Sequence, residues 1–505
     1  MSGRFVIGID DGTQSIRMIL YDEKGKIINS ATAKHAPLIV TQPGWAEHDS
    51  HDLWESFCRA SNELMGKFSG KVQDIVGIGL SSQRDTIVAV DQNCNMLHNP
   101  ISWLDNRREQ NYLTLTPATR ENVTKYEHSV RLRSRVNWHK LNRPDIYEKA
   151  YKYLTMGGYY GYKLTGNYVD SVSNNNGWPY DPKTFTIADA SFCEEAGLSR
   201  AIMAEIVQSC SLIGNILPNA SEITGFPNGC PVYTSGGDKQ CELAGAGAMA
   251  LDQAYISLGT QCTAVVVTDK FIFPDDLCFH PCFSLLPGFF NNEVFVDKGF
   301  WTVSWFRDNL ASDMTAVSEE TGLSVEDLLN REAERVPVGS EGLVVLPDWQ
   351  APQSRPNSKG LFLGFDERHG RAHMYRALIE GILLDINYSF GKMNALLGSR
   401  PVSLRLGGGG SKSSLVAQIT ADIFGLPVIR TEDSETCSLG AAMCATVGSG
   451  IYSSLAESAE MMVYEKDVFD FLPENHQIYR LISETVSKQL YPCLREVFDA
   501  LKEIR

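Results

Sequence analysis

Short apolar runs broken by glycine-containing turns open the chain, and this pattern predicts β-strands. The expected strands of the N-terminal part are Phe5–Ile9, Arg17–Tyr21, Ile27–Ala33, Ile75–Leu80 and Thr86–Val90. From His51 to Phe68 the apolar residues recur every three or four positions instead, which predicts a helix whose start is marked by Asp49 and Ser50. A three-stranded meander followed by a helix and a strand is typical of an α/β layer architecture.

The second half of the chain repeats this order. Its expected elements are the strands Gln253–Ser257, Cys262–Thr268 and Val402–Leu406 and the helices Tyr375–Leu397 and Ser413–Phe424. The Ala- and Gly-rich segment Glu435–Val447 predicts a final buried helix whose backbone comes close to a neighbour or a ligand. Because 505 residues exceed one ordinary core, we expect two domains, 1–247 and 248–505, joined near Gly245–Ala248.

Composition narrows the function classes. The chain is 43% apolar and 21% charged, as soluble globular proteins are. Its 61 acidic residues outnumber 45 basic ones, which argues against a nucleic-acid surface. No apolar run resembles a signal peptide or is long enough to cross a bilayer, so no membrane partner is expected. Cys278 and Cys282, with His280 between them, lack a second ligand pair for zinc, so we expect reduced thiols and a cytoplasmic protein.

Two glycine-containing hairpins carry the strongest chemical signal. Asp10 ends a strand before Gly12-Thr13-Gln14-Ser15, and Gly259-Thr260 echoes this turn near the middle of the chain. Small residues let backbone N–H groups and a threonine hydroxyl approach an anion closely. Asp10 is suited to hold hydrated magnesium, and Thr13 and Ser15 to meet phosphate oxygens. An ordinary Asp-Gly turn is the alternative for the first hairpin alone, but the echo favours a pair that grips one nucleotide.

Two strand-to-helix turns provide further candidates. Asp238 follows Gly236-Gly237, where a carboxylate can accept the proton of a substrate hydroxyl as its oxygen attacks phosphorus. A helix N-cap is the alternative role for this aspartate. The loop Gly407–Ser413 follows an expected strand and opens a helix, so a base or ribose can lie on its backbone. A flexible connector is the alternative there, although four consecutive glycines cost considerable backbone entropy.

A cation, a carboxylate and an indole are candidates for substrate binding. Arg84-Asp85 follows an apolar strand, and Trp103 comes soon after. The charged pair can fix vicinal hydroxyls while the ring packs against C–H faces, which is a typical way to hold a polyhydroxylated compound. The alternative is a surface ion pair and a core tryptophan.

Taken together, these residues resemble the FGGY family of carbohydrate kinases over essentially the full chain. The stretches that carry the resemblance are Ile9–Thr13, Pro43–Asp49, Trp103–Arg107, Gly237-Asp238, Ser257–Thr260, Lys359–Gly364, Gly408–Lys412 and Leu439–Ala442. Each is short, but their order and spacing make the combination specific.

The resemblance implies two RNase H-like (actin-like ATPase) α/β domains flanking a central cleft. The implied catalytic base is Asp238, with Asp10 and Asp238 at magnesium. The residues implied for substrate are Arg84, Asp85, Trp103 and Lys239. The residues implied for ATP are Asp10, Gly12, Thr13, Ser15, Gly259, Thr260, Gly409, Gly410 and Lys412. Dimers are common in similar proteins, so a homodimer is a possible assembly.

We therefore expect an ATP-dependent kinase that phosphorylates a hydroxyl of a small sugar or polyol. Arg84-Asp85 is closer to the Arg-Glu pair of glycerol kinases than to the Met-His pair usual in xylulokinases, whereas the latter half looks closer to xylulokinases and autoinducer-2 kinases. These patterns leave the substrate and its phosphorylated hydroxyl open. A different class, an actin- or chaperone-like ATPase, explains the paired hairpins but not Arg84, Asp85 and Trp103.

Overall fold

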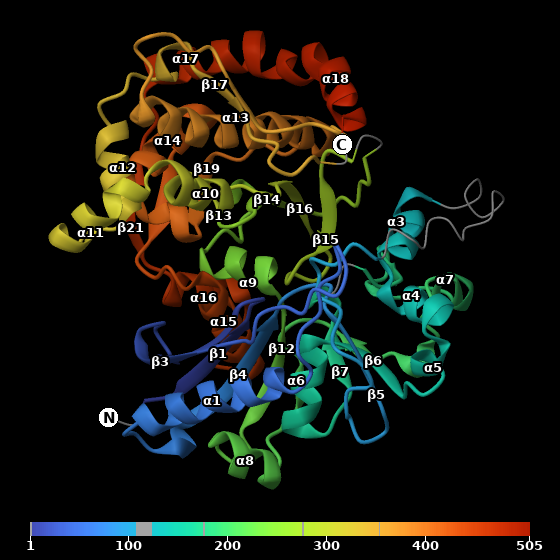
Figure 1. Cartoon of the computed structure of the whole chain (residues 1–505). Coiled ribbons are helices and arrows are strands. Elements are labelled where there is room, and N and C mark those ends of the chain that lie inside the picture. The colour runs from blue at the N-terminus through green and yellow to red at the C-terminus, as the bar shows by residue number, and fades with distance from the viewer. Residues whose placement is uncertain (1–2, 108–123, 175–176, 275–276, 353, 505) are drawn as a thin grey trace. The chain divides into compact units, whose positions relative to one another are not determined.

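The computed structural model describes residues 3–107, 124–174, 177–274, 277–352 and 354–504 (Figure 1). Their packing divides the chain into two compact units. The first unit contains the chain up to Met249 together with residues 282–290 and 435–463, and the second contains residues 250–281, 291–434 and 464–505. Two segments from the C-terminal half of the sequence therefore fold as part of the first unit.

The first unit is built on a six-stranded sheet with the strand order β11-β12-β4-β1-β2-β3. Strands β1, β2 and β3 form an antiparallel meander, while β4 lies parallel to both β1 and β12. The strands are β1 (Phe5–Asp11), β2 (Ser15–Asp22), β3 (Ile27–Lys34), β4 (Ile75–Ser82), β11 (Leu212–Asn215) and β12 (Pro231–Gly237). The predicted meander and fourth strand are thus confirmed, and so is the helix between them, α1 (Asp52–Lys67).

Helices cover the two faces of this sheet. On one face, the buried side chains of α1 (Asp52–Lys67) pack with those of α6 (Met156–Thr165) against Ile7 and Ile9 of β1. On the other face, α15 (Thr436–Gly448) lies against β1, β4 and β12 and packs on α9 (Asp238–Gly245). Helices α8 (Pro218–Thr224) and α16 (Leu455–Met462) complete these layers (Figure 1).

The close approach of α15 depends on glycines in the sheet. A Cβ atom on Gly8 of β1 would lie 1.9 Å from the carbonyl oxygen of Ser438, and one on Gly79 of β4 would lie 1.8 Å from that of Ala441. No side chain fits at such distances, so the helix backbone rests directly on the strands. The prediction of a buried helix with a closely packed backbone is confirmed.

Smaller elements complete the first unit beside the sheet. They include three two-stranded sheets, formed by β5 with β6, β7 with β10 and β8 with β9. Their strands are β5 (Ile87–Val90), β6 (Lys152–Thr155), β7 (Val169–Ser171), β8 (Tyr180–Asp181), β9 (Thr186–Ile187) and β10 (Glu205–Val207). Four short helices accompany them: α3 (Lys125–Arg133), α4 (Arg135–Asn142), α5 (Pro144–Tyr147) and α7 (Ala190–Glu195).

The second unit repeats the strand order of the first. Its seven-stranded sheet runs β15-β16-β14-β13-β19-β20-β21, so β16, β14, β13, β19, β20 and β21 correspond to β3, β2, β1, β4, β12 and β11. The strands are β13 (Gln253–Leu258), β14 (Cys262–Thr268), β15 (His280–Phe283), β16 (Phe290–Val296), β19 (Ser403–Gly407), β20 (Val428–Thr431) and β21 (Glu465–Phe469). The predicted duplication of two α/β domains is confirmed.

The helices of the second unit surround a separate core centred on α13 (Arg371–Leu397). This helix begins four residues before the predicted Tyr375, because its first turn alternates polar and apolar residues and does not continue the apolar pattern of the rest. The other elements are α10 (Trp301–Leu310), α11 (Thr315–Thr321), α12 (Val325–Ala333), β17 (Val344–Leu346), β18 (Leu361–Leu363), α14 (Ser414–Phe424), α17 (Pro473–Ile482) and α18 (Lys488–Glu503). The expectation that α15 is the final helix is wrong, because the amphipathic helices α16, α17 and α18 follow it.

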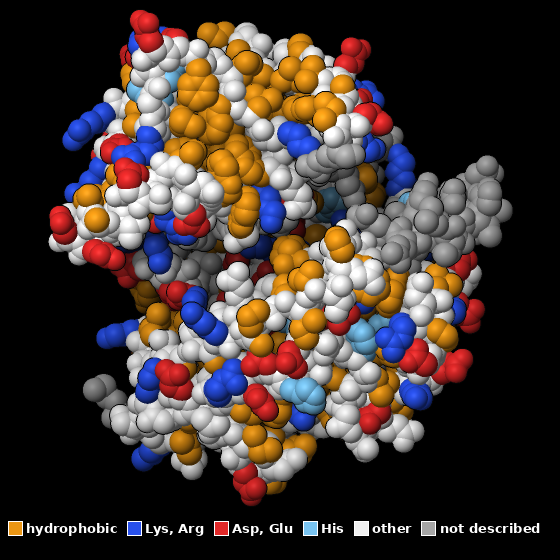
Figure 2. Space-filling view, viewed as in Figure 1, with side chains coloured by type: hydrophobic (Ala, Val, Ile, Leu, Met, Phe, Trp, Pro, Cys, Tyr) orange, Lys and Arg blue, Asp and Glu red, His pale blue; other side chains and the backbone are white. Residues whose placement is uncertain are grey.

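Two further features bear on partners. Figure 2 shows acidic and basic side chains interspersed over the visible face, and the sequence carries a net charge of −16. Within the described ranges, no helix is both long and apolar enough to cross a membrane.

Candidate active site

Asp10 lies where β1 ends, on the face of the sheet covered by α15. Its Oδ1 accepts a hydrogen bond from the thiol of Cys437 at 3.1 Å. Burial, together with the negative charges of Asp238 and Glu242, raises the pKa of Asp10 to about 7, although the Cys437 bond and Arg17 oppose the shift. Asp10 therefore belongs to a cluster of carboxylates that favours a bound proton or cation.

Asp238 is the first residue of α9, directly after the end of β12. The helix cap is Gly237, and no side-chain cap bond is present, so the N-cap alternative for Asp238 is wrong. Oδ1 of Asp238 is buried and accepts no hydrogen bond. The side chain as a whole is 31% exposed, through its other atoms. Burial raises the pKa of this carboxyl, an effect that Arg84 and Lys239 oppose and Glu242 reinforces.

Arg84 lies over the backbone that leads to Asp238. Its Nε is 3.4 Å from Asp238 Oδ1, and a Cβ atom on Gly237 would lie 2.2 Å from Arg84 Cγ. Its Nη1 also donates to Cys282 Sγ at 3.5 Å. The guanidinium is thus a fixed positive charge beside the carboxylate.

Asp85 and Lys239 make contacts of their own. Asp85 has a φ of 60°, and its Oδ1 accepts the N–H of Gly177 at 3.1 Å. A left-handed conformation is uncommon outside glycine and often occurs at functional sites. The ammonium of Lys239 contacts both carboxylate oxygens of Glu242, at 2.8 and 3.0 Å.

Trp103 contacts the first hairpin directly. Its indole N–H donates to the hydroxyl oxygen of Thr13 at 2.7 Å. Because that oxygen accepts the indole proton, the hydroxyl proton of Thr13 remains available for another acceptor. The two residues, predicted for substrate and for phosphate respectively, therefore lie together in the first unit.

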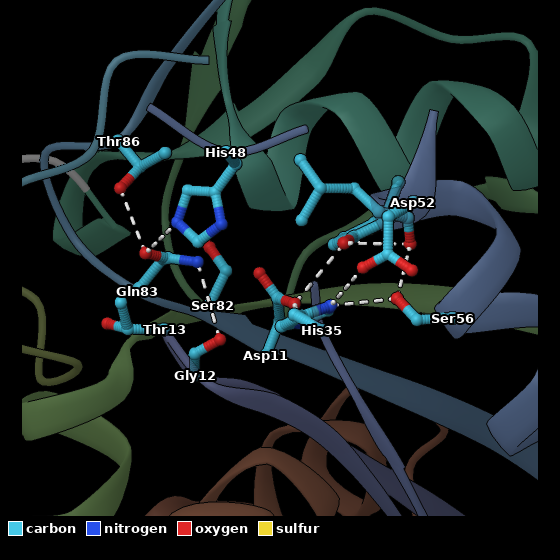
Figure 3. A network of polar contacts seen from close by, with 12 residues as sticks. Asp11, Gly12, Thr13, His35, His48, Asp52, Ser56, Ser82, Gln83 and Thr86 are labelled. Atoms are coloured by element: carbon cyan, nitrogen blue, oxygen red, sulfur yellow. Dashed lines mark hydrogen bonds and ion pairs between the residues drawn. The ribbon is translucent and has the colours of Figure 1, made fainter. Parts of the chain in front are cut away.

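Gln83 holds the turn that carries Gly12 and Thr13 (Figure 3). Its backbone N–H donates to Asp11 O at 2.7 Å, and its side-chain amide donates to Gly12 O at 3.4 Å. His48 Nε2 and the Thr86 hydroxyl both contact the Gln83 amide oxygen, at 3.1 and 3.0 Å. Within the turn, Gly12 N–H donates to the Ser15 carbonyl at 3.0 Å.

Successive side chains of a strand alternate in direction, so Asp11 lies on the opposite face of β1 from Asp10. It belongs to the buried network around Gln83 (Figure 3). Its Oδ1 contacts His35 Nε2 at 3.0 Å and accepts the Tyr160 hydroxyl at 3.2 Å. His35 Nδ1 contacts the Ser56 hydroxyl at 2.8 Å. Although burial opposes it, the hydrogen bond and charge of Asp11 raise the pKa of His35.

Two of the motif stretches meet at a buried arginine. Arg107 contacts Glu47 and Asp105, each at 2.8 Å, and its guanidinium lies 3.9 Å from the centre of the Trp45 ring. Asp105 Oδ2 also accepts the N–H of Ala46 at 2.6 Å. These contacts join Pro43–Asp49 to the loop that carries Trp103. The residues of Pro43–Asp49 that make them therefore stabilise the position of this loop.

In the second unit, the hairpin turn Gly259-Thr260 and the glycine loop both contact the start of α10. Phe300 N–H donates to Gly259 O at 3.0 Å, and Trp301 N–H donates to Thr260 O at 3.3 Å. A Cβ atom on Gly410 would lie 2.4 Å from the Phe300 ring, whereas Gly409 has open space at that position. Glycine at 410 is therefore explained by packing within the chain, and glycine at 409 is not.

Hydrogen bonds fix the glycine loop. Its residues Gly409–Lys412 form a 3₁₀ turn, and Ser413 caps α14 through its hydroxyl. Arg430 Nη1 donates to the carbonyl oxygens of Ser411 and Lys412, at 3.0 and 2.9 Å. The flexible-connector alternative is therefore wrong. The side chain of Lys412 is exposed beside this turn.

The structure thus groups the predicted residues into two sets, one in each unit. The sequence analysis did not predict three residues near Asp10, namely Cys437, Glu242 and Ser81. The Ser81 hydroxyl lies 3.5 Å from Cys437 Sγ. Cys437 lies more than four hundred positions from Asp10, so no local pattern connects them. Within the described ranges, no group of three or more His, Cys, Asp or Glu side chains is arranged to hold a metal ion by itself.

Known proteins match the chain along nearly its whole length. Residues 5–245 match the N-terminal domain of the FGGY family of carbohydrate kinases, and residues 254–449 match its C-terminal domain. An uncharacterized sugar kinase of Escherichia coli strain K12, YgcE, is 33% identical over 97% of this chain and 94% of its own. The xylulose kinase of Bacillus subtilis strain 168 is 28% identical over 99% of both chains.

The fold is also that of solved kinases. The crystal structure of xylulose kinase from Rhodospirillum rubrum superposes with a TM-score of 0.86 at 22% identity, covering 98% of this chain and all of that one. The predicted two-domain, actin-like ATPase fold class is thereby confirmed. Kinases of this class use ATP and transfer its phosphoryl group to a hydroxyl of a small sugar, so the chaperone-like alternative is not supported. This chain belongs to the FGGY family of carbohydrate kinases.

Proposed function

We propose that Asp238 is the catalytic base of a sugar or polyol kinase. It takes the proton of the substrate hydroxyl as the hydroxyl oxygen attacks the γ-phosphorus of ATP and the bond to ADP breaks. Arg84, Asp85, Trp103 and Lys239 bind the substrate in this proposal.

One observation carries the assignment of the base. Asp238 Oδ1 is a buried acceptor without a hydrogen-bond partner, held 3.4 Å from Arg84 Nε in a partly exposed side chain. A buried carboxylate oxygen that accepts no hydrogen bond costs free energy, so such atoms in native structures often belong to a functional group. The raised pKa of Asp238 is consistent with a group that accepts a proton during turnover.

The carboxylates fit the magnesium ion that accompanies ATP in kinases. Mg²⁺ prefers one or two protein carboxylates, with waters and phosphate oxygens completing its shell. Asp10 and Asp238 supply such oxygens. Burial, with a smaller contribution from the charges of Asp238 and Glu242, raises the pKa of Asp10, and a bound cation would offset both effects. We propose these two residues as the magnesium ligands. The bound ion neutralises phosphate charge.

The nucleotide residues come from both halves of the sequence in this proposal. Gly12, Thr13 and Ser15 contact phosphate in the domain 1–247, and Gly259 and Thr260 do so in the domain 248–505. The residues proposed for the adenosine side are Gly409, Gly410 and Lys412. Two observations support these roles. Gly409 has open space beside it, and the Thr13 hydroxyl, which accepts a hydrogen bond from Trp103, can still donate its own proton.

Substrate identity, compartment and assembly are also proposals. Xylulose is the first candidate because a relative that covers the whole chain carries that name, and the autoinducer-2 precursor is the alternative. The cytoplasm is the proposed compartment, since all twelve cysteines are free thiols. A homodimer is the proposed assembly, which light scattering tests.

Replacement of the base tests the proposal. Asp238→Asn keeps the shape but cannot take a proton, so kcat should fall at least about 100-fold while the dissociation constant for ADP, measured without Mg²⁺, changes by less than about 3-fold. Steady-state kinetics and calorimetry measure these quantities. Asp269→Asn, at an exposed position, is the control and should match wild type. A near-wild-type kcat in Asp238→Asn would remove this residue as the base.

A further inference from the structure

The first turn of α15 connects the ends of three neighbouring strands. Cys437 Sγ lies 3.1 Å from Asp10 Oδ1, at the end of β1, and 3.5 Å from Ser81 Oγ, at the end of β4. The Ser81 hydroxyl in turn donates to the carbonyl oxygen of Gly236 at 3.0 Å, at the end of β12. Gly236 is two residues before Asp238, so this chain of contacts leads from one proposed catalytic carboxylate to the peptide that carries the other.

The position of the thiol is fixed by backbone packing. Gly440, one turn after Cys437, would place a Cβ atom 2.0 Å from the carbonyl oxygen of Cys241 in α9. Gly8 and Gly79 bring the sheet equally close to the same helix. Because α15 touches β1, β4 and α9 through backbone, its side chains cannot shift along the sheet without a clash. Cys437 is buried, with 6% of its surface exposed.

We propose that Cys437 is a positioning residue for phosphoryl transfer, whose S–H group holds Oδ1 of Asp10 and leaves the second oxygen of this carboxylate free for magnesium. The inference rests on the proposed metal role of Asp10. A thiol is a weak donor, but a hydrogen bond to a carboxylate is stronger than one between neutral groups. An Asp10 side chain without this bond can rotate about its terminal torsion, which is broad, and loses its fixed direction.

Three variants separate the hydrogen bond from packing. Cys437→Ser keeps a donor, whereas Cys437→Val and Cys437→Ala remove it, one with and one without filling the space. Mn²⁺ replaces Mg²⁺ as the probe, and its affinity for the protein–ADP complex is measured by electron paramagnetic resonance. We expect the Val and Ala variants to bind Mn²⁺ about 10-fold more weakly, and the Ser variant to remain within about 3-fold of wild type.

A matched control lies on the same helix. Cys444, two turns further along α15, is also buried, and Cys444→Val should leave Mn²⁺ affinity unchanged. Thermal melting of each variant shows whether it is folded. Wild-type Mn²⁺ affinity in folded Cys437→Val would overturn the proposal, and so would an equal loss in the Ser and Val variants, because both point to packing alone.

Asp10→Asn distinguishes failure of this inference from failure of the proposed function. Loss of Mn²⁺ binding in Asp10→Asn, together with unchanged binding in Cys437→Val, overturns only the role of Cys437. Unchanged Mn²⁺ binding in Asp10→Asn overturns the proposed metal role of Asp10, and the role of Cys437 with it.

Discussion

At the scale of single residues, the pleat of β1 decides what two adjacent aspartates do. Successive side chains of a strand point to opposite faces. Asp10 therefore contacts Cys437 of α15, while Asp11 contacts His35 and Tyr160 on the other face. The sequence alone predicts Asp10 as a ligand residue from the strand and turn around it. The partner of Asp11 could not be predicted, because His35, which lies just after β3, has no local signature that connects it to β1.

The Asp11–His35 pair makes stability depend on pH. The pKa of His35 is raised above its usual value of about 6.5, so the folded state binds the proton more tightly than the unfolded state. The stabilisation is therefore fully present below about pH 6.5 and is lost as the pH rises through the folded-state value. In urea unfolding, the stability advantage of wild type over His35→Gln should shrink as the pH rises. An advantage that grows with pH would contradict this assignment.

At the scale of elements, local patterns predicted the hairpins and the helices α1, α13, α14 and α15, but not the role of α15. Its apolar composition predicts burial, and its contacts with β1, β4 and β12 bring a late segment into the first unit. Such contacts join residues that are hundreds of positions apart, so periodicity cannot reveal them. Asp238 illustrates the same limit: the turn was predicted, but only the structure distinguishes a cap from the first residue of a helix.

The packing of α15 predicts a strong effect for one methyl group. Gly79→Ala places a Cβ atom 1.8 Å from the carbonyl oxygen of Ala441, so the helix must move and stability should fall by about 3 kcal/mol. Gly66→Ala, in α1 with no atom within 4 Å, is the control and should raise stability by up to ~1 kcal/mol. Chemical denaturation measures both. Equal effects of the two substitutions would rule out backbone contact as the reason for glycine at 79.

At the scale of the whole molecule, one strand order is used twice with different chemistry. In the first unit, the ends of β1, β4 and β12 gather Asp10, Ser81 and Asp238. In the second unit, the corresponding end of β13 leads into the Gly259-Thr260 turn, and that of β19 leads into the glycine loop Gly407–Ser413. The duplication was predictable from repeated patterns. Substrate identity was not, because it depends on a few side chains that the shared fold does not determine.

On this protein, a sugar or polyol should accept the phosphoryl group of ATP. Coupled measurement of ADP release, with and without each member of a panel of glycerol, erythritol, pentuloses, aldonates and the autoinducer-2 precursor, tests it most directly. At least one compound should raise the rate about 100-fold or more and be recovered as its phosphate monoester. An ATP hydrolysis rate that is the same with every compound as with none would contradict it.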